Sequence, residues 1–165
     1  MTAQADSGDS RVVIQTADFS QDAVYQAMRK KLGAAVGAVV TFVGLVRERN
    51  AQAGSGEVVD TLTLEHYPGM TEASIARILE QAEARWPVLD CHVIHRVGTM
   101  RPAEQIVLVA VASAHRDAAF AAAEFVMDYL KTDAVFWKRE VADGSAHWVE
   151  STDQDRQRAD TWQQK

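Results

Sequence analysis

The sequence predicts an α+β fold, and two observations support this prediction. Apolar runs with the two-residue period of strands alternate with segments of helical spacing, in the approximate order β-α-β-β-α-β-β-α-β-β. Several neighbouring strands are joined by turns too short for a crossover helix, so these pairs must run antiparallel. We therefore expect antiparallel pairing and not a doubly wound parallel sheet.

In the first half of the chain, three β-branched or alternating apolar runs predict strands, at residues 11–16, 37–46 and 59–67. Ser20 can cap a helix that ends near Leu32, because Gly33 follows as a stop signal. Two glycines and a serine in residues 51–57 indicate a flexible loop.

In the second half, Thr71 can cap a helix that ends before Pro87. Two strands are expected at residues 89–98 and 104–114, the second apolar enough to be central and covered on both faces. Residues 117–132 have helical periodicity. A hairpin around Asp143-Gly144 should join residues 135–141 to 147–150.

Length and composition fit one globular domain with short extensions. The chain has 165 residues, of which 47% are hydrophobic and 24% are charged. Residues 1–10 are small and polar, which indicates a disordered N-terminal tail. We expect a single domain over residues 11–150 and a polar C-terminal tail over residues 151–165.

The charge and the cysteine count exclude several classes of protein. A net charge of −6 disfavours nucleic-acid binding, and no apolar run is long enough for a membrane span. There is no secretory signal, so we expect a cytoplasmic protein. The single cysteine, Cys91, excludes an internal disulfide and fits an ordinary half-buried thiol. His92 and His95 would lie on opposite faces of a strand, and we expect no metal site.

One group of basic residues could form a site for an anion. Six Lys and Arg stand against five acids between residues 96 and 139, in a chain that is otherwise acidic. His115 and Arg116 lie where an apolar strand meets a helix N-terminus, which favours anion binding. Lys131 follows near the other end of that helix, and Lys138 lies on the next strand. Residue by residue, solvated ends of helices and strands explain the same charges.

Six segments in a fixed order resemble the MoaE family, the large catalytic subunits of molybdopterin synthase. The similarity extends from about Val12 to Glu150. The combination of the HR, DxxK and WKxE motifs makes it specific. The segments are residues 37–47 (GAVVTFVGLVR), 64–70 (LEHYPGM), 95–98 (HRVG), 113–116 (SAHR), 127–131 (MDYLK) and 136–140 (FWKRE).

The resemblance implies an α/β-hammerhead-type domain with an additional antiparallel sheet. It implies a sulfurtransferase that converts cyclic pyranopterin monophosphate to molybdopterin by inserting two sulfurs as a dithiolene. The sulfur would arrive on a small ubiquitin-like carrier, whose C-terminal Gly-Gly is activated as a thiocarboxylate. The assembly would be a homodimer with a carrier at each end, a heterotetramer, and no bound cofactor is implied. A basic pocket would suit both the substrate phosphate and the thiocarboxylate.

The resemblance also assigns roles to individual residues. Lys131 and Lys138 are the expected catalytic residues, either as cations or, if desolvated, as groups that transfer protons or attack an acyl carbon. Two further residues, Phe42 and Met127, are candidates for pocket lining, although core packing explains them equally well. The expected substrate-binding residues are Leu45, Val46, Arg47, His115, Arg116, Arg139 and Glu140.

This sequence departs from the family pattern at two places. Ala103 stands where the family usually has glycine before the glutamate, Glu104. Ser151-Thr152 stands where many members carry an arginine thought to reach the neighbouring subunit; the next arginines are Arg156 and Arg158. A non-catalytic dimeric module that binds an anion or a partner's C-terminal tail is the alternative interpretation. It differs from the enzyme in predicting that Lys→Arg at 131 is mild.

Overall fold

A four-stranded sheet lies at the centre of the computed structural model, which describes residues 11–48 and 59–164. This central sheet has the order β1-β4-β6-β2. β1 runs parallel to β4, whereas β4 and β2 both pair antiparallel with β6. The strands are β1 (Val12–Gln15), β2 (Ala38–Leu45), β4 (Val88–Arg96) and β6 (Gln105–Ser113).

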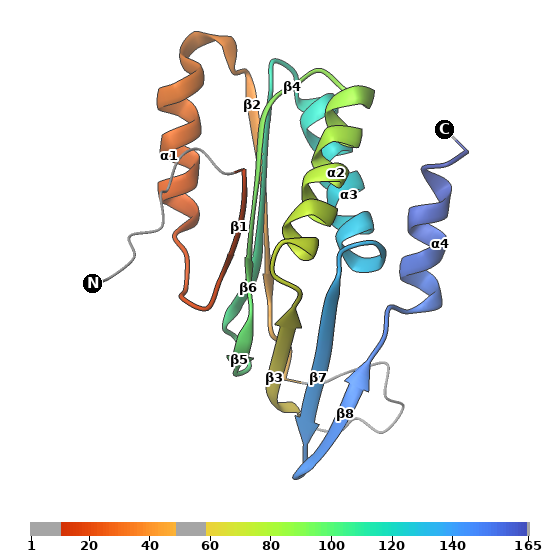
Figure 1. Cartoon of the computed structure of the whole chain (residues 1–165). Coiled ribbons are helices and arrows are strands. Elements are labelled where there is room, and N and C mark those ends of the chain that lie inside the picture. The colour runs from red at the N-terminus through yellow and green to blue at the C-terminus, as the bar shows by residue number, and fades with distance from the viewer. Residues whose placement is uncertain (1–10, 49–58, 165) are drawn as a thin grey trace.

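Helices cover both faces of the central sheet. Helix α1 (Gln21–Leu32) lies on one face, while α2 (Met70–Arg85) and α3 (Arg116–Thr132) lie on the other (Figure 1). Strand β6 is therefore enclosed, and its residues 107–113 are all buried. This is the central, doubly covered strand that the apolar run predicts.

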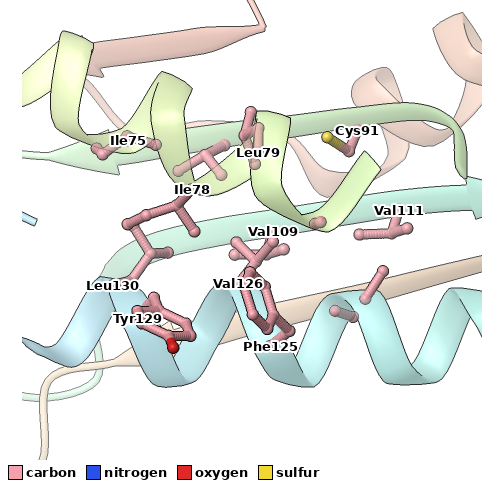
Figure 2. Packing of buried hydrophobic residues seen from close by; sticks show 14 of the residues in the cluster. Ile75, Ile78, Leu79, Cys91, Val109, Val111, Phe125, Val126, Tyr129 and Leu130 are labelled. Carbon is pink, nitrogen blue, oxygen red and sulfur yellow. The ribbon is translucent and has the colours of Figure 1, made fainter. Parts of the chain in front are cut away.

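The main hydrophobic core fills the space between the central sheet and helices α2 and α3. Figure 2 shows Ile75, Ile78 and Leu79 of α2 facing Phe125 and Val126 of α3 across side chains of β6. A smaller cluster on the opposite face packs Met28 of α1 against Ala110 and Ala112. Burying large apolar side chains at about 1.5–3 kcal/mol each makes this layer the main source of stability.

A second sheet continues from the end of the central sheet, with the order β5-β3-β7-β8 and antiparallel pairing throughout (Figure 1). One face buries Leu62, Leu64 and Met100 against Val46. The strands are β3 (Val59–His66), β5 (Gly98–Met100), β7 (Phe136–Ala142) and β8 (Ser145–Val149). The α+β class with an additional antiparallel sheet is confirmed.

Local signals set the ends of the helices. The Ser20 hydroxyl accepts the Ala23 N–H at 3.2 Å, and Gly33 ends α1 with φ 56°, before a 3-10 turn over Gly33–Ala35. At α2 the prediction of a Thr71 cap is wrong, because Gly69 is the N-cap. The buried Thr71 hydroxyl instead donates to the Val135 carbonyl at 2.6 Å and ties α2 to the start of β7.

The polar tail expected from residue 151 contains a docked helix, α4 (Asp153–Thr161). Thr152 caps it, since its hydroxyl accepts the Asp155 N–H at 3.1 Å. Trp162 is buried and packs edge-on against the rings of Trp86 and Phe125, with ring centroids 5.4 and 5.7 Å apart. One buried tryptophan therefore holds a helix whose other residues are almost all polar, which is why apolar periodicity did not reveal it.

Strand β5 was also not predicted, because it has only three residues. The expected tail at residues 1–10 and the expected loop at 51–57 lie outside the described residues. None of the helices described in the structure is long and apolar enough to cross a membrane.

Candidate active site

Lys138 occupies an inner strand of the second sheet. Strand β7 lies between β3 and β8, so the backbone that carries Lys138 is hydrogen-bonded on both sides. The side chain is 36% exposed, and its Nζ lies 3.4 Å from Oε1 of Glu140, which is two residues along the strand and therefore on the same face. The sheet thus holds this amine in a fixed and partly desolvated place.

The surroundings of Lys138 lower its pKa from the ordinary value. Burial is the largest cause, since it disfavours the charged ammonium. The cations Lys131 and Arg47 lower the pKa further, whereas Glu140 opposes the shift. Three basic side chains from β7, from the end of α3 and from the segment after β2 therefore act on one another.

Lys131 lies in the last turn of α3 and lines a groove of about 510 Å³ between β2, α3 and α4. Phe42 and Met127, the two candidates for pocket lining, line the same groove. The exposed ring of Phe42 fits a lining role, and Met127 is partly buried. Phe42 and Met127 thus form an apolar part of the groove wall next to the catalytic candidate Lys131.

Arg47 lies two residues after the end of β2 and is exposed, as is Leu45. Val46 between them is buried against Leu62 and Leu64. Of the three residues predicted to contact substrate in this segment, Val46 therefore packs in the core, and Leu45 and Arg47 are the accessible ones.

Glu140 and Arg139 do not lie on the same face. Register places Glu140 opposite Leu62 and on the face of Lys138, whereas Arg139 stands opposite Thr63 and Trp148. Arg139 therefore does not extend the Lys138 site within this chain, because consecutive strand residues point to opposite faces. Its Nε is buried and has no hydrogen-bond partner among the residues that the structure describes.

His115 and Arg116 lie at the opposite end of α3 from Lys131. Both are exposed and, with Asp117, line a separate depression at the helix N-terminus. Fifteen residues of helix separate Arg116 from Lys131, which is about 22 Å at 1.5 Å per residue. A single chain does not bring these two groups to one small substrate.

The sequence profile described as MoaE protein matches residues 14–133 of this chain. The chain belongs to the MoaE family. The molybdopterin synthase catalytic subunit of Vibrio cholerae is 52% identical over 155 residues, which are 94% of this chain and 99% of that protein. The Escherichia coli K12 protein of the same name is 52% identical over 126 residues, 76% of this chain and 81% of that one. The predicted family and enzyme, a molybdopterin synthase catalytic subunit, are confirmed.

Solved structures of the MoaE family have the same fold. The MoaE protein of Burkholderia ambifaria superposes with a TM-score of 0.77 at 42% identity, covering 92% of this chain and 97% of that one. The structure of molybdopterin synthase from Staphylococcus aureus gives a TM-score of 0.73 at 28% identity, covering 84% and 96%. The fold predicted from the resemblance is confirmed by both.

The two arginines nearest to the departure at Thr152 are engaged within their own chain. Arg156 donates to the Ser151 carbonyl at 2.7 Å and lies 3.7 Å from Asp153. Arg158 pairs with Glu124 at 3.0 Å and Asp128 at 3.3 Å. The two Arg158 ion pairs attach α4 to α3, whereas the contacts of Arg156 stay at the start of α4.

Cys91 is unsuited to nucleophilic chemistry. It is buried in the core, and burial raises the pKa of its thiol to about 12, with Glu83 adding to the shift. Among the described residues, no group of three His, Cys, Asp or Glu side chains is placed to hold a metal ion. The described site offers lysines and arginines beside a groove that is partly apolar and is also lined by Glu124, Asp128 and Asp155.

Most of the residues that line the groove were not predicted as site residues, and Phe120 and Arg158 are two of them. Phe120 is 63% exposed and shares helical spacing with Ala123 and Met127. The same spacing relates it to Met127, so the pocket-lining hypothesis for Met127 could have included it. Arg158 could not be found, because α4 itself was not predicted.

Proposed function

We propose that this chain transfers sulfur from the thiocarboxylated C-terminus of a small ubiquitin-like carrier to cyclic pyranopterin monophosphate, forming the dithiolene of molybdopterin. The observation that carries the proposal is Lys138, a half-buried amine held on an inner strand beside Glu140, with Lys131 and Arg47 near enough to lower its pKa, in a chain whose only cysteine is buried. The name of the relatives, catalytic subunit, implies a further subunit. A carrier with a Gly-Gly tail fits that role.

The sulfur comes from outside this chain. A sulfur-carrying cysteine must be accessible and ionise near neutral pH, whereas Cys91 is buried with a pKa of about 12. The site instead offers positive charge, which suits a thiocarboxylate and a substrate phosphate equally. The single free cysteine also fits a reducing compartment, and we place the reaction in the cytoplasm.

Each round of transfer forms one carbon–sulfur bond and breaks one acyl–sulfur bond. The thiocarboxylate sulfur bonds to a carbon of the pterin side chain while an oxygen substituent of that carbon leaves, either as the oxygen of the opened cyclic phosphate or as water, and a second water then attacks the carrier's acyl carbon. The carrier leaves as a carboxylate, while the sulfur stays on the pterin. Two carriers are consumed for each dithiolene, so the spent carrier must leave between rounds.

Lys138 takes the proton-transfer role in this scheme. Its lowered pKa increases the fraction of neutral amine, which can accept the proton of the attacking water. Lys131, which lines the groove, stabilises the negative charge that develops on the acyl oxygen. Arg47 contributes a permanent cation for the phosphate.

A second copy of this chain supplies His115 and Arg116 to the substrate. The two ends of α3 are too far apart to act on one pterin, so a homodimer must bring them together. Subunit complementation tests this arrangement. Mixed dimers of Lys131→Ala and Arg116→Ala should regain about a quarter to a half of wild-type activity, while each parent stays impaired. No recovery after verified subunit exchange would contradict the shared site.

The direct test of the proposed function follows the sulfur itself. Carrier thiocarboxylated with ³⁵S is mixed with this chain and the cyclic pyranopterin in a single turnover. We expect label in the dithiolene product with wild type and equally with Cys91→Ser. Label that appears on Cys91, or product that requires it, would overturn the external sulfur source.

The Lys131→Arg variant distinguishes a non-catalytic binding module from the enzyme. If the chain only binds its partner, Lys131→Arg should weaken binding little, because the positive charge is kept. For the enzyme, the same change should keep carrier binding and lose turnover, because a guanidinium has a different shape and cannot release its proton. Carrier affinity and single-turnover yield, measured on the same preparation, decide between the two.

A further inference from the structure

The backbone on the N-terminal side of Arg47 is clamped by the turn at residues 101–104. The Val46 N–H donates to the Glu104 carbonyl at 2.9 Å, and the Val46 carbonyl accepts the Ala103 N–H at 2.8 Å. Val46 also packs in the small core of the second sheet. The residue before Arg47 is therefore fixed by two backbone hydrogen bonds and by burial.

The C-terminal side of Arg47 is held as well. The Glu48 carbonyl accepts the Val59 N–H at 2.7 Å, which ties it to the first residue of β3. Arg47 thus sits between two anchored neighbours even though its own side chain is exposed. Such anchoring sets where the guanidinium can reach, because the side chain starts from a fixed Cα.

The clamping turn is itself held by the Glu104 carboxylate. One oxygen accepts the Arg101 N–H at 2.6 Å and closes the turn, while the other lies 3.4 Å from both terminal nitrogens of Arg96. The Glu104 side chain is 41% exposed, but that of Arg96 is only 9% exposed. The buried guanidinium of Arg96 thus supports the Glu104 carboxylate, which closes the turn.

Arg96 is in turn fixed by backbone carbonyls. Its Nε donates to Thr16 at 3.1 Å, and Nη1 donates to Gln105 at 2.9 Å. It therefore links the end of β1 to the start of β6 and cannot follow Glu104 if that residue moves. An unbroken chain of contacts leads from the rigid central sheet through Arg96 and Glu104 to Val46.

We propose that Arg96 and Glu104 are positioning residues for Arg47: they hold the turn at 101–104, whose backbone clamps Val46 and sets the place of the Arg47 guanidinium beside Lys138. Neither residue touches the substrate. The proposal refines the site of the proposed function, although the geometry it describes can be tested without any turnover.

The first test measures geometry and needs no substrate. Reaction of Lys138 with an amine reagent is followed against pH in wild type, Arg47→Ala and Glu104→Gln. Losing or displacing Arg47 removes a positive charge that lowers the pKa of Lys138. The pH midpoint of Lys138 labelling should therefore rise in both variants. Exchange of the Val46 amide should become at least tenfold faster in Glu104→Gln. A midpoint that rises in Arg47→Ala but not in Glu104→Gln would overturn the proposal.

The second test measures kinetics with a double-mutant cycle. Glu104→Gln should lower kcat/KM for the pterin about tenfold in the wild-type background and less than twofold in Arg47→Ala. An equal loss in both backgrounds would show that Glu104 does not act through Arg47. If wild type itself makes no product, the proposed function fails, while the amine-labelling result still decides the positioning role.

A matched control removes a different arginine–glutamate pair. Glu83 of α2 pairs with Arg11 away from the site. Glu83→Gln should leave the Lys138 midpoint, the Val46 exchange rate and kcat/KM unchanged. Should Glu104→Gln fail to fold, Arg96→Lys weakens the same contact while keeping the charge, and the same three readouts apply.

Discussion

The two sheets each have four strands, but they differ in how much of their surface is buried. The central sheet is enclosed by helices on both faces, and residues 107–113 of its inner strand are all buried. The second sheet exposes Trp137 and Trp148 and carries a half-buried lysine on its inner strand. The comparison teaches that stability is concentrated in the central layer, while the half-buried amine of the site lies on the second sheet; Lys131, on α3, brings the other part of the site to the central layer.

Because of this separation, substitutions in the second sheet should change turnover with little loss of stability. Substitutions that reach the core of the central sheet should do the reverse. Four predictions test the division, and they are ordered from the largest expected effect to the smallest.

Lys138→Ala should lower single-turnover rate about a thousandfold, within the range that general acid–base groups contribute, with the melting temperature nearly unchanged. If neutral Lys138 is the base, kcat/KM in wild type rises with pH through a pKa below the usual lysine value. Glu140→Gln removes the partner that raises this pKa, so the midpoint should move to lower pH.

The control for Lys138 is Lys30→Ala, which removes an exposed lysine of α1. It should leave both rate and pH profile unchanged. A Lys138→Ala variant that turns over at the wild-type rate would remove this residue from the chemistry.

Trp162→Ala should destabilise the protein by about 3 kcal/mol, because it removes a buried aromatic from the main core and a 2.8 Å hydrogen bond to Asp128. Trp148→Ala is the matched change on the second sheet, where the ring is 64% exposed, and should cost the isolated chain less than about 0.5 kcal/mol. Urea unfolding of both variants measures the difference. Equal losses would contradict the division between the sheets.

His95 lies at the junction of the two sheets, stacked on Phe136 at 4.0 Å. Burial lowers its pKa to about 4 from 6.5. The unfolded chain therefore binds more protons between these values, and stability falls as pH drops from 6.5 toward 4, by up to about 3 kcal/mol. His95→Phe should flatten this part of the stability curve. A variant with the same acid sensitivity as wild type would assign the sensitivity to other groups.

Ala103 adopts φ 72° in the turn that clamps Val46, a conformation that costs a residue with a Cβ about 1 kcal/mol. Ala103 thus adopts a left-handed conformation that favours glycine, the residue usual in the family at this position. Ala103→Gly should stabilise the protein by about 0.5–1 kcal/mol and leave turnover unchanged. Gly144→Ala, at φ 77° in the β7–β8 hairpin, should have the opposite sign. Thermal melts check both.

Local signals in the sequence were sufficient for most of the fold. Ser20 and Gly33 predicted the ends of α1, and Asp143-Gly144 predicted the hairpin of β7 and β8. The failures have physical causes. Strand β5 is too short for periodicity, and α4 is held by contacts of Trp162 and Arg158 with distant segments, which no local apolar pattern contains.

The site was predictable in its composition but not in its arrangement. Motifs identified Lys131, Lys138 and Arg47, which the structure brings together. Strand alternation alone could have separated Arg139 from Lys138. The roles of Arg96 and Glu104 required coordinates, because they depend on backbone hydrogen bonds between segments more than fifty residues apart.

The most direct test of the central claim is a single turnover with wild type beside Lys131→Ala, each with thiocarboxylated carrier and cyclic pyranopterin. The account predicts dithiolene product with wild type and none with the variant, while the carrier co-elutes with both. Product from neither, despite an intact complex, would contradict a catalytic role and reduce this chain to a docking module.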